Sequence, residues 1–278
     1  MRGVVVGVSG STEANMALDW ALREAASYEA PLTAVMAAGS QPGQQQEYLA
    51  SLVDAALQRT GLSVETTAVV AEGDAPDALI AAAKDADMLV LGRRHLGRLG
   101  RLVLGSVSSE LVERAELPVT VVRAPGDNDA APAQDAGGAP RIVIGVDTSG
   151  SSRLALRHAA DVAAHTGATL EVVFAWQMAS LATLPGSQGW TPPMDDYESF
   201  AARNLDKAIA DADLDLPADR IVRKVTHKAP AAALIEASRG ADRLVVGARG
   251  LGGFQRLLLG SVSRQVLEYA SVPVTVVR

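Results

Sequence analysis

Two loops rich in glycine and serine could do chemistry in this chain, because each could bind an anion. The second runs from Gly247 through Gly250 to Gly260-Ser261, with the spacing G-x2-G-x9-G-S. Glycines let the backbone come close to a ligand, and a serine at a helix start can cap the helix or help to bind a phosphate. The loop lacks the lysine of a Walker A motif, and its glycines follow the fourth predicted strand rather than the first, unlike a dinucleotide-binding fingerprint. We therefore predict a phosphate-binding loop of another kind.

The same loop occurs earlier in the chain, within a long internal repeat. Residues 87–123 and 242–278 are identical at 22 of 37 positions with a constant offset of 155. Two copies of a domain can keep a buried core with any apolar residues of suitable size. The identical glycines and serines in both copies therefore indicate a role other than core packing. In the first copy, these positions are Gly92, Gly105, Ser106 and Ser108.

The elements that must position these loops follow one pattern in both halves. Short Val- and Ile-rich runs, typical of buried parallel strands, alternate with amphipathic helices. The predicted strands are Gly3–Val8, Leu32–Ala37, Val64–Val70, Met88–Leu91 and Val119–Val122, then Arg141–Val146, Leu170–Ala175, Ile221–Thr226, Arg243–Val246 and Val274–Val277. This alternation predicts an α/β fold with two tandem doubly wound domains, each a five-stranded, mainly parallel sheet with helices on both faces.

Composition shifts mark the boundaries of these units. Residues 124–140 are almost pure Ala, Gly, Pro and Asp, which predicts a flexible linker between domain 1 (1–123) and domain 2 (141–278). The longest difference between the units is the loop Gln177–Asp196. A solvated insertion is the favoured interpretation, and a lid or docking loop carrying an exposed Trp190 is the alternative.

Bulk composition excludes several classes of protein. The net charge of −7 and the pI near 5.2 argue against a general nucleic-acid binder. No uncharged apolar run reaches membrane-spanning length, and no signal peptide is recognised, so we expect a cytoplasmic protein without membrane contact. The absence of cysteine excludes disulfides and thiol chemistry.

A carboxylate follows the first predicted strand of domain 2, at the position where doubly wound sheets bind their ligands. Asp147 follows the first strand of domain 2, and it faces the same crevice as the Gly247–Gly250 turn if the first and fourth strands flank the reversal of strand order. An aspartate there can accept hydrogen bonds from a ribose hydroxyl or help to position a hydrated metal ion. The alternative is that Asp147 caps the following helix and that the glycines only form turns.

With these motifs the chain resembles the universal stress protein family in its tandem, ATP-binding form. The resemblance rests on G-x2-G-x9-G-S, on the run VIGVD at Val143–Asp147 and on the closing VPVTVV, and it covers nearly the whole chain. It implies a Rossmann-like, adenine nucleotide alpha hydrolase-like fold that binds ATP or AMP, with Mg2+ as a candidate companion of the phosphates. The nucleotide-binding residues that it implies in domain 2 are Asp147, Ala175, Gly247, Gly250, Gly260, Ser261 and Ser263. Asp147 and the backbone of Ala175 would meet the nucleoside, and the others would hold ribose and phosphates.

Domain 1 departs from this pattern at two positions. Ser9 stands where Asp147 stands, and His95 stands where Gly250 stands. Serine lacks the charge and reach of a carboxylate, and histidine adds bulk where the backbone would approach a phosphate, although it could also donate a hydrogen bond to it. We therefore predict a weaker nucleotide site in domain 1, made of Ser9, Ala37, Gly92, His95, Gly105, Ser106 and Ser108.

Other charged residues give no comparable signal. The basic residues Arg93, Arg94, Arg98 and Arg101 lack aromatic stacking partners, which favours phosphate steering or a solvated face over nucleic-acid binding. The four histidines, His95, His158, His165 and His227, share no metal-ligand spacing between the domains, so no protein-held metal site is predicted.

The expected function is that of an ATP-binding regulator or sensor in the stress response. No catalytic residue is predicted, and at most slow ATP hydrolysis is expected. A weak Mg-dependent ATPase and a non-catalytic dimerisation scaffold with vestigial sites are the alternatives. The family resemblance also implies pairing through the terminal strands 117–123 and 272–278, and a homodimer of tandem chains.

Overall fold

Buried β-branched runs and helical patterns produce the alternating elements that the sequence predicts. The computed structural model describes residues 2–38, 42–93, 105–123, 140–177, 194–250 and 259–278. Domain 1 contains β1 (Val4–Gly7), α1 (Thr12–Ser27), β2 (Leu32–Ala37), α2 (Pro42–Thr60), β3 (Thr66–Ala71), α3 (Ala75–Ala82), β4 (Met88–Gly92), α4 (Ser106–Arg114) and β5 (Val119–Val122). Domain 2 contains β6 (Arg141–Gly145), α5 (Gly150–Thr166), β7 (Thr169–Trp176), α6 (Met194–Ala212), a short 3-10 turn at Ala218–Arg220, β8 (Ile221–His227), α7 (Pro230–Ala237), β9 (Arg243–Gly247), α8 (Ser261–Tyr269) and β10 (Val274–Val277).

The strands form one continuous sheet that runs through both domains. Its order is β3-β2-β1-β4-β5-β10-β9-β6-β7-β8. Neighbouring strands within each domain are parallel, whereas β5 and β10 meet antiparallel, with Thr120 opposite Thr275. The predicted fold class is confirmed, and the two domains are joined through their last strands.

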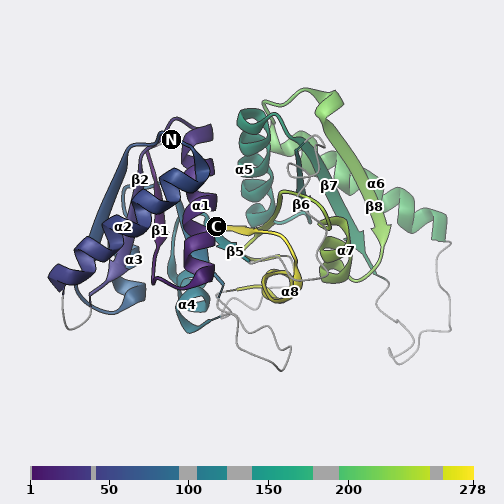
Figure 1. The fold of residues 1–278 in the computed structure, drawn as a ribbon. Helices are drawn as coiled ribbons and strands as arrows, with labels where there is room; N and C mark the ends of the chain where they lie inside the picture. The colour runs from purple at the N-terminus through teal and green to yellow at the C-terminus, as the bar shows by residue number, and fades with distance from the viewer. Residues whose placement is uncertain (1, 39–41, 94–104, 124–139, 178–193, 251–258) are drawn as a thin grey trace, which may run out of the picture.

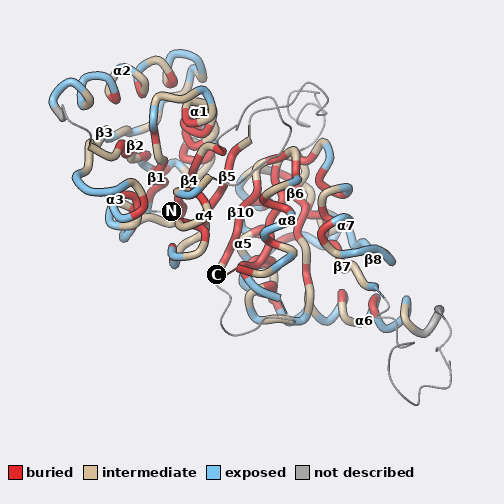
Figure 2. Tube along the Cα trace, turned by 90° about the horizontal axis from the view of Figure 1, so that it is seen from below, coloured by how far each residue is buried: buried red, intermediate tan, exposed pale blue. Residues whose placement is uncertain are grey.

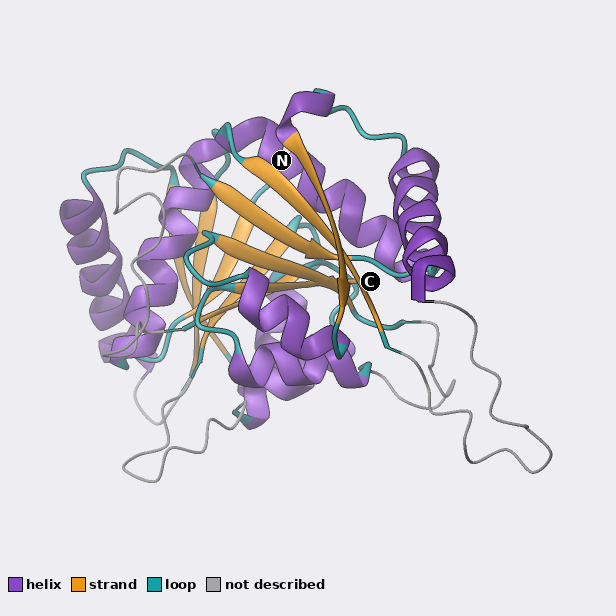
Figure 3. Ribbon diagram, turned by 90° about the vertical axis from the view of Figure 1, so that its right-hand side faces the viewer, coloured by secondary structure: helices purple, strands orange, loops and turns teal. Residues whose placement is uncertain are grey.

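Helices cover both faces of each half of the sheet (Figures 1 and 3). In domain 1, α1 and α2 pack against each other on one face, and α3 and α4 do so on the other. In domain 2, the corresponding pairs are α5 with α6 and α7 with α8. The helices α1 and α5 face each other across the centre of the molecule (Figure 1).

The buried core follows this layering (Figure 2). One apolar cluster lies under α1 and α2, and a second lies under α5 and α6. A third cluster is shared by the two domains, because Leu111 and Val121 of domain 1 belong to it together with Val266 and Val274 of domain 2. The domains are therefore held together by a common core as well as by backbone hydrogen bonds.

The long loop of domain 2 and the linker between the domains lie mostly outside the described residues. The predicted loop Gln177–Asp196 is too long, because α6 already begins at Met194. The remainder of that loop, with Trp190, and the linker lie outside the described residues apart from Gln177 and Pro140.

In the part of the chain that the structure describes, no helix is long and apolar enough to cross a membrane.

The terminal strands pair with each other inside one chain. β5 lies between β4 and β10, and β10 lies between β5 and β9, so both edges of both strands are occupied. A second chain therefore has no free edge to join at 117–123 or 272–278. The homodimer itself stays a prediction, and it would need another surface or an exchange of strands.

Candidate functional site

Each domain has its own crevice. In each domain the strand order reverses between the first and fourth strands, β1 and β4 or β6 and β9, which is where such sheets bind ligands. The described residues that line each crevice come from one domain only. Each crevice is thus formed by its own domain.

The crevice of domain 2 collects every residue predicted for it. Its volume is about 470 Å3, within the range of about 300–1,000 Å3 that is usual for small-molecule sites. All seven predicted residues line this cavity: Asp147, Ala175, Gly247, Gly250, Gly260, Ser261 and Ser263. The bottom of the crevice is apolar, with Val173 from β7 and Leu234 from α7. A polar rim over an apolar base suits a ligand with a charged end and a flat, weakly polar end.

The start of α8 presents free backbone amides to this crevice. Gly260 is the N-cap residue and makes no side-chain cap, while its own amide donates to the carbonyl of Ala248 at 2.8 Å. A helix leaves its first amides without intrahelical partners, and the helix dipole adds positive potential at this end. The first turn of α8 is therefore suited to bind an anion such as phosphate.

Ser263 joins two elements that form the crevice, while its predicted contact with ribose or phosphate stays a prediction. Its hydroxyl is buried and donates to the carbonyl of Gly247 at 2.7 Å. That bond ties the first turn of α8 to the end of β9. Ser263 therefore fixes the wall of the crevice, whereas Ser261 is exposed at the helix start.

Asp147 does not cap the following helix. The N-cap residue of α5 is Ser149, whose hydroxyl accepts from the amide of Ser152 at 3.2 Å. Asp147 Oδ1 accepts from the amide of Ser149 at 2.9 Å, which orients the carboxylate at the end of β6. The capping alternative for Asp147 is therefore excluded by this geometry.

The glycines are needed for space rather than for unusual backbone angles. Neither Gly247, Gly250 nor Gly260 has a positive φ. A Cβ at Gly250 would lie 2.5 Å from Asp147 Oδ2, and one at Gly247 would lie 2.7 Å from Ser151 Oγ. Packing against the first turn of α5 already requires a glycine at Gly247, and the predicted contact of Gly247 with a ligand stays a prediction. Gly250, in contrast, keeps the space beside the carboxylate open.

Several crevice residues were not predicted from the sequence. Ser152 lies in the first turn of α5 and lines the cavity, where its Oγ accepts from the amide of Asp147 at 3.0 Å. Ser151, next to it, accepts from the amide of Arg249 at 3.4 Å through its Oγ and so holds the loop beside the crevice. Arg249 itself lines the cavity and is exposed. The run of polar residues that follows Asp147 was the available signal, but it could be interpreted as helix capping alone.

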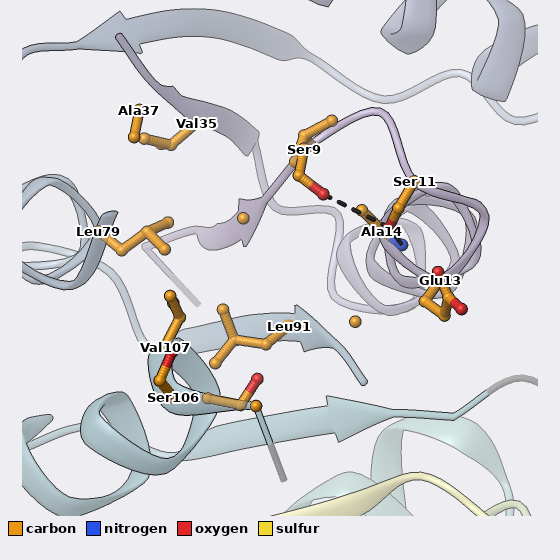
Figure 4. A pocket seen from close by; sticks show the side chains of 15 residues that line it. Ser9, Ser11, Glu13, Ala14, Val35, Ala37, Leu79, Leu91, Ser106 and Val107 are labelled. Atoms are coloured by element: carbon orange, nitrogen blue, oxygen red, sulfur yellow. Dashed lines mark hydrogen bonds between the residues drawn. The ribbon is translucent and has the colours of Figure 1, made fainter. Parts of the chain in front are cut away.

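The crevice of domain 1 is built from the same elements but is smaller (Figure 4). Its volume is about 150 Å3, below the usual range for ligand sites. Six predicted residues line it: Ser9, Ala37, Gly92, Gly105, Ser106 and Ser108. His95 lies outside the described residues.

Side chains at the helix start distinguish the two crevices. Ser9 is exposed, and its hydroxyl lies 3.4 Å from that of Ser11, which caps α1 by accepting from Ala14 (Figure 4). Glu13 lines the domain 1 cavity at the position that Ser151 occupies in domain 2. Domain 1 thus lacks the carboxylate at the strand end and carries one in the first turn of α1 instead, which disfavours an anion there.

No protein-made metal centre is present in the described part of the chain. There, no group of three or more His, Cys, Asp or Glu side chains is placed to hold a metal ion. His158 and His165 lie on α5 and His227 ends β8, away from both crevices. A divalent cation in domain 2 would have to be held largely by phosphates, with Asp147 as the one carboxylate nearby.

Comparison with known proteins agrees with this architecture. The model of the universal stress protein family matches residues 1–123 and 139–278. A universal stress protein from Mycolicibacterium smegmatis is 32% identical over 297 residues, covering 99% of this chain and 97% of the relative. One from Mycobacterium tuberculosis is 34% identical over 298 residues, covering 100% of this chain and 97% of the relative. The crystal structure of a universal stress protein from Archaeoglobus fulgidus has the same fold, with a TM-score of 0.70, 18% identity and coverage of 99% and 98% of the two chains. The chain therefore belongs to the universal stress protein family.

Proposed function

We propose that domain 2 binds an adenine nucleotide, ATP or AMP, and that the chain acts as a nucleotide-dependent regulator or sensor in the stress response. One observation carries the proposal: the seven residues expected from the family motif surround a single cavity of about 470 Å3 at the reversal of strand order. A vestigial crevice would not need to keep both the uncapped start of α8 and the space beside Asp147.

The residues of the crevice have separable roles in this proposal. The amides at the start of α8 and the Ser261 hydroxyl donate to phosphate oxygens. Asp147 accepts from a ribose hydroxyl, and Gly250 leaves the room that this contact requires. The apolar base, with Val173 and Leu234, takes the flat face of the base.

Regulation would follow from binding to the folded state alone. Such binding stabilises the native protein by mass action, by about 2.7 kcal/mol at a hundredfold excess of ligand over Kd. Asp147 is the one carboxylate among the described lining residues, and its Oδ1 already accepts from Ser149. This arrangement favours binding over water activation, so regulation rather than turnover is the proposed role.

Native mass spectrometry of the purified chain, followed by identification of released nucleotide, tests this proposal. We expect one adenine nucleotide per chain, or its uptake from ATP, and a rise in Tm with ATP. Gly250→His places in domain 2 the residue that domain 1 has, and it should weaken binding at least about tenfold, or 1.4 kcal/mol. Glu47→His, on an exposed part of α2, is the matched control.

The outcomes separate the alternatives. No nucleotide and no change in Tm would contradict the proposal and favour a dimerisation scaffold. ADP release that requires Mg2+ and disappears in Asp147→Ala would instead favour a weak ATPase.

A further inference from the structure

The helix that forms the domain 2 crevice ends against domain 1. Arg93 directly follows the last residue of β4, and its Nη2 donates to the carbonyl of Glu268 in α8 at 2.6 Å. Arg123 follows β5, and its Nη1 donates to the carbonyl of Ala270, the C-cap residue of α8, at 3.1 Å. Two arginines of one domain thus hold the carboxyl end of a helix in the other.

Among the described residues, one arginine of domain 2 makes the opposite contact, with the carbonyls at the end of α4. Arg278 follows β10 and donates to the carbonyls of Val112, at 3.0 Å, and Glu113 near the end of α4. Ala248 occupies in domain 2 the position that Arg93 occupies in domain 1, so no second guanidinium of this kind is available for α4. The helix of the larger crevice is therefore anchored by one arginine more than the helix of the smaller crevice.

These contacts suit the chemistry of a helix end. The last carbonyls of a helix lack intrahelical donors, and a cation is stabilised by the negative end of the helix dipole. Arg93 is only 4% exposed, and its burial, with Arg123 nearby, lowers the pKa of its guanidinium to about 10. It remains charged at neutral pH, so domain 1 keeps a buried cation whose described side-chain hydrogen bond goes to α8.

The two ends of α8 are close enough to act as one body. The helix has nine residues, which corresponds to about 13 Å. Its first turn faces the crevice, and Ser263 in that turn is tied to the carbonyl of Gly247. A displacement of the carboxyl end would thus also move the amides that face the ligand.

We propose that Arg93 is a positioning residue for the domain 2 nucleotide site, and that domain 1 sets the affinity of that site through α8. Arg93 lies next to Gly92, which lines the domain 1 crevice, so the contact with α8 starts at the wall of that crevice. The inference rests on the proposed function only in taking the domain 2 crevice as the nucleotide site.

The test uses the full chain with Arg93→Ala, Arg93→Lys and a control. Alanine is the residue that the repeat already has at this position, in Ala248, and lysine keeps a cation at the helix end. The control is Glu113→Gln, which removes the exposed interdomain ion pair with Arg264 but leaves the carboxyl end of α8 untouched. Two quantities are measured: the Kd for ATP by calorimetry, and hydrogen exchange of the α8 amides without nucleotide, with the strand β6 as an internal reference.

In Arg93→Ala we expect a Kd raised about fivefold, with faster exchange in the first turn of α8 and unchanged exchange in β6. Arg93→Lys and Glu113→Gln should both stay within about twofold of the wild-type Kd. Unchanged exchange in α8 overturns the proposal, and so does faster exchange with an unchanged Kd, because Arg93 would then only stabilise the interface. If the wild-type chain binds no ATP, the proposed function fails, while the exchange of the first turn of α8 still decides whether Arg93 positions it.

Discussion

Each crevice carries one carboxylate among its described lining residues, but at different places. In domain 2 it is Asp147, at the end of β6, and in domain 1 it is Glu13, in the first turn of α1. A carboxylate in the first turn of α1 is favourable for that helix, yet its negative charge repels a phosphate bound in the same crevice. Single side chains thus give two similar backbones different preferences for ligands.

Exchanging these side chains should create a second nucleotide site. In Ser9→Asp/Glu13→Ser, domain 1 receives the residues that domain 2 has at both positions. We expect ATP to bind in domain 1 at least about tenfold more tightly than in the wild type, which corresponds to 1.4 kcal/mol. Calorimetry should then detect a second ATP per chain. The exchange leaves the net charge of the chain unchanged, and an unchanged stoichiometry in the double variant would mean that the small volume, rather than the placement of the carboxylate, closes domain 1.

At the scale of elements, the sequence predicts the strands well because buried parallel strands have a strong composition signal. Leu32–Ala37, Val119–Val122 and Val274–Val277 are found with the predicted bounds. The predicted start of the third strand, Val64, was two residues too early, because Val64 packs against the apolar core but precedes the ladder, which begins at Thr66.

The sequence predicted which residues line the domain 2 crevice, but not which contacts each of them makes. Spacing and repetition identified all seven residues that line the domain 2 cavity. The roles of Ser263 and Gly247 depend on which backbone atoms come close in space, and neither distance is encoded locally. The spacing and repetition of the motif therefore identified the crevice, whereas the three-dimensional packing determines the contacts that each residue makes.

The bond between α8 and β9 gives a prediction at this scale. Ser263→Ala removes the hydroxyl that the Gly247 carbonyl accepts from, so the first turn of α8 loses its tie to the sheet. A buried hydrogen bond contributes about 0.5–1.5 kcal/mol, so we expect the domain 2 Kd for ATP to rise about three- to tenfold. Ser108→Ala, the same change in domain 1, is the control and should leave that Kd unchanged. Equal effects of both variants on binding would show that the tie is not specific to the domain 2 crevice.

At the scale of the whole molecule, the interface between the two domains, called the seam below, contains two kinds of contact. One joins equivalent residues of the repeat and is symmetric, and the other joins residues without equivalents and is asymmetric. The symmetric part is the pairing of β5 with β10, where the hydroxyls of Thr120 and Thr275 lie 2.8 Å apart. The asymmetric part is the buried ion pair between Arg243 of β9 and Glu24 of α1, with the Arg243 guanidinium 4.6 Å from the Trp20 ring. The sequence did not predict this pair, because its partners are 219 residues apart and the repeat has no equivalent.

A buried histidine beside this ion pair is uncharged. His158 on α5 faces Arg243, and burial together with this positive charge lowers its pKa to about 3. The imidazole is therefore neutral at physiological pH, so that Arg243 and Glu24 balance each other without a second cation. Arg243 and Glu24 therefore form a buried pair of charges between the domains, each of them about 5% exposed.

Because each charge is buried with the other, removing both should cost less than the sum of the two single removals. The repeat suggests the apolar replacements, since Met88 stands at the position of Arg243 and Val162 at that of Glu24. We expect Glu24→Val and Arg243→Met each to lower the free energy of unfolding by about 3–5 kcal/mol, because each leaves an unpaired buried charge. The double variant should be destabilised less than the sum of the two, by about 2 kcal/mol or more. Urea denaturation of the four proteins measures this coupling, and the exposed pair Arg59–Asp19 provides a reference cycle expected to give about 0.2–1 kcal/mol. Additive losses at Glu24 and Arg243 would contradict the expectation and would mean that the two charges act independently of each other at the seam.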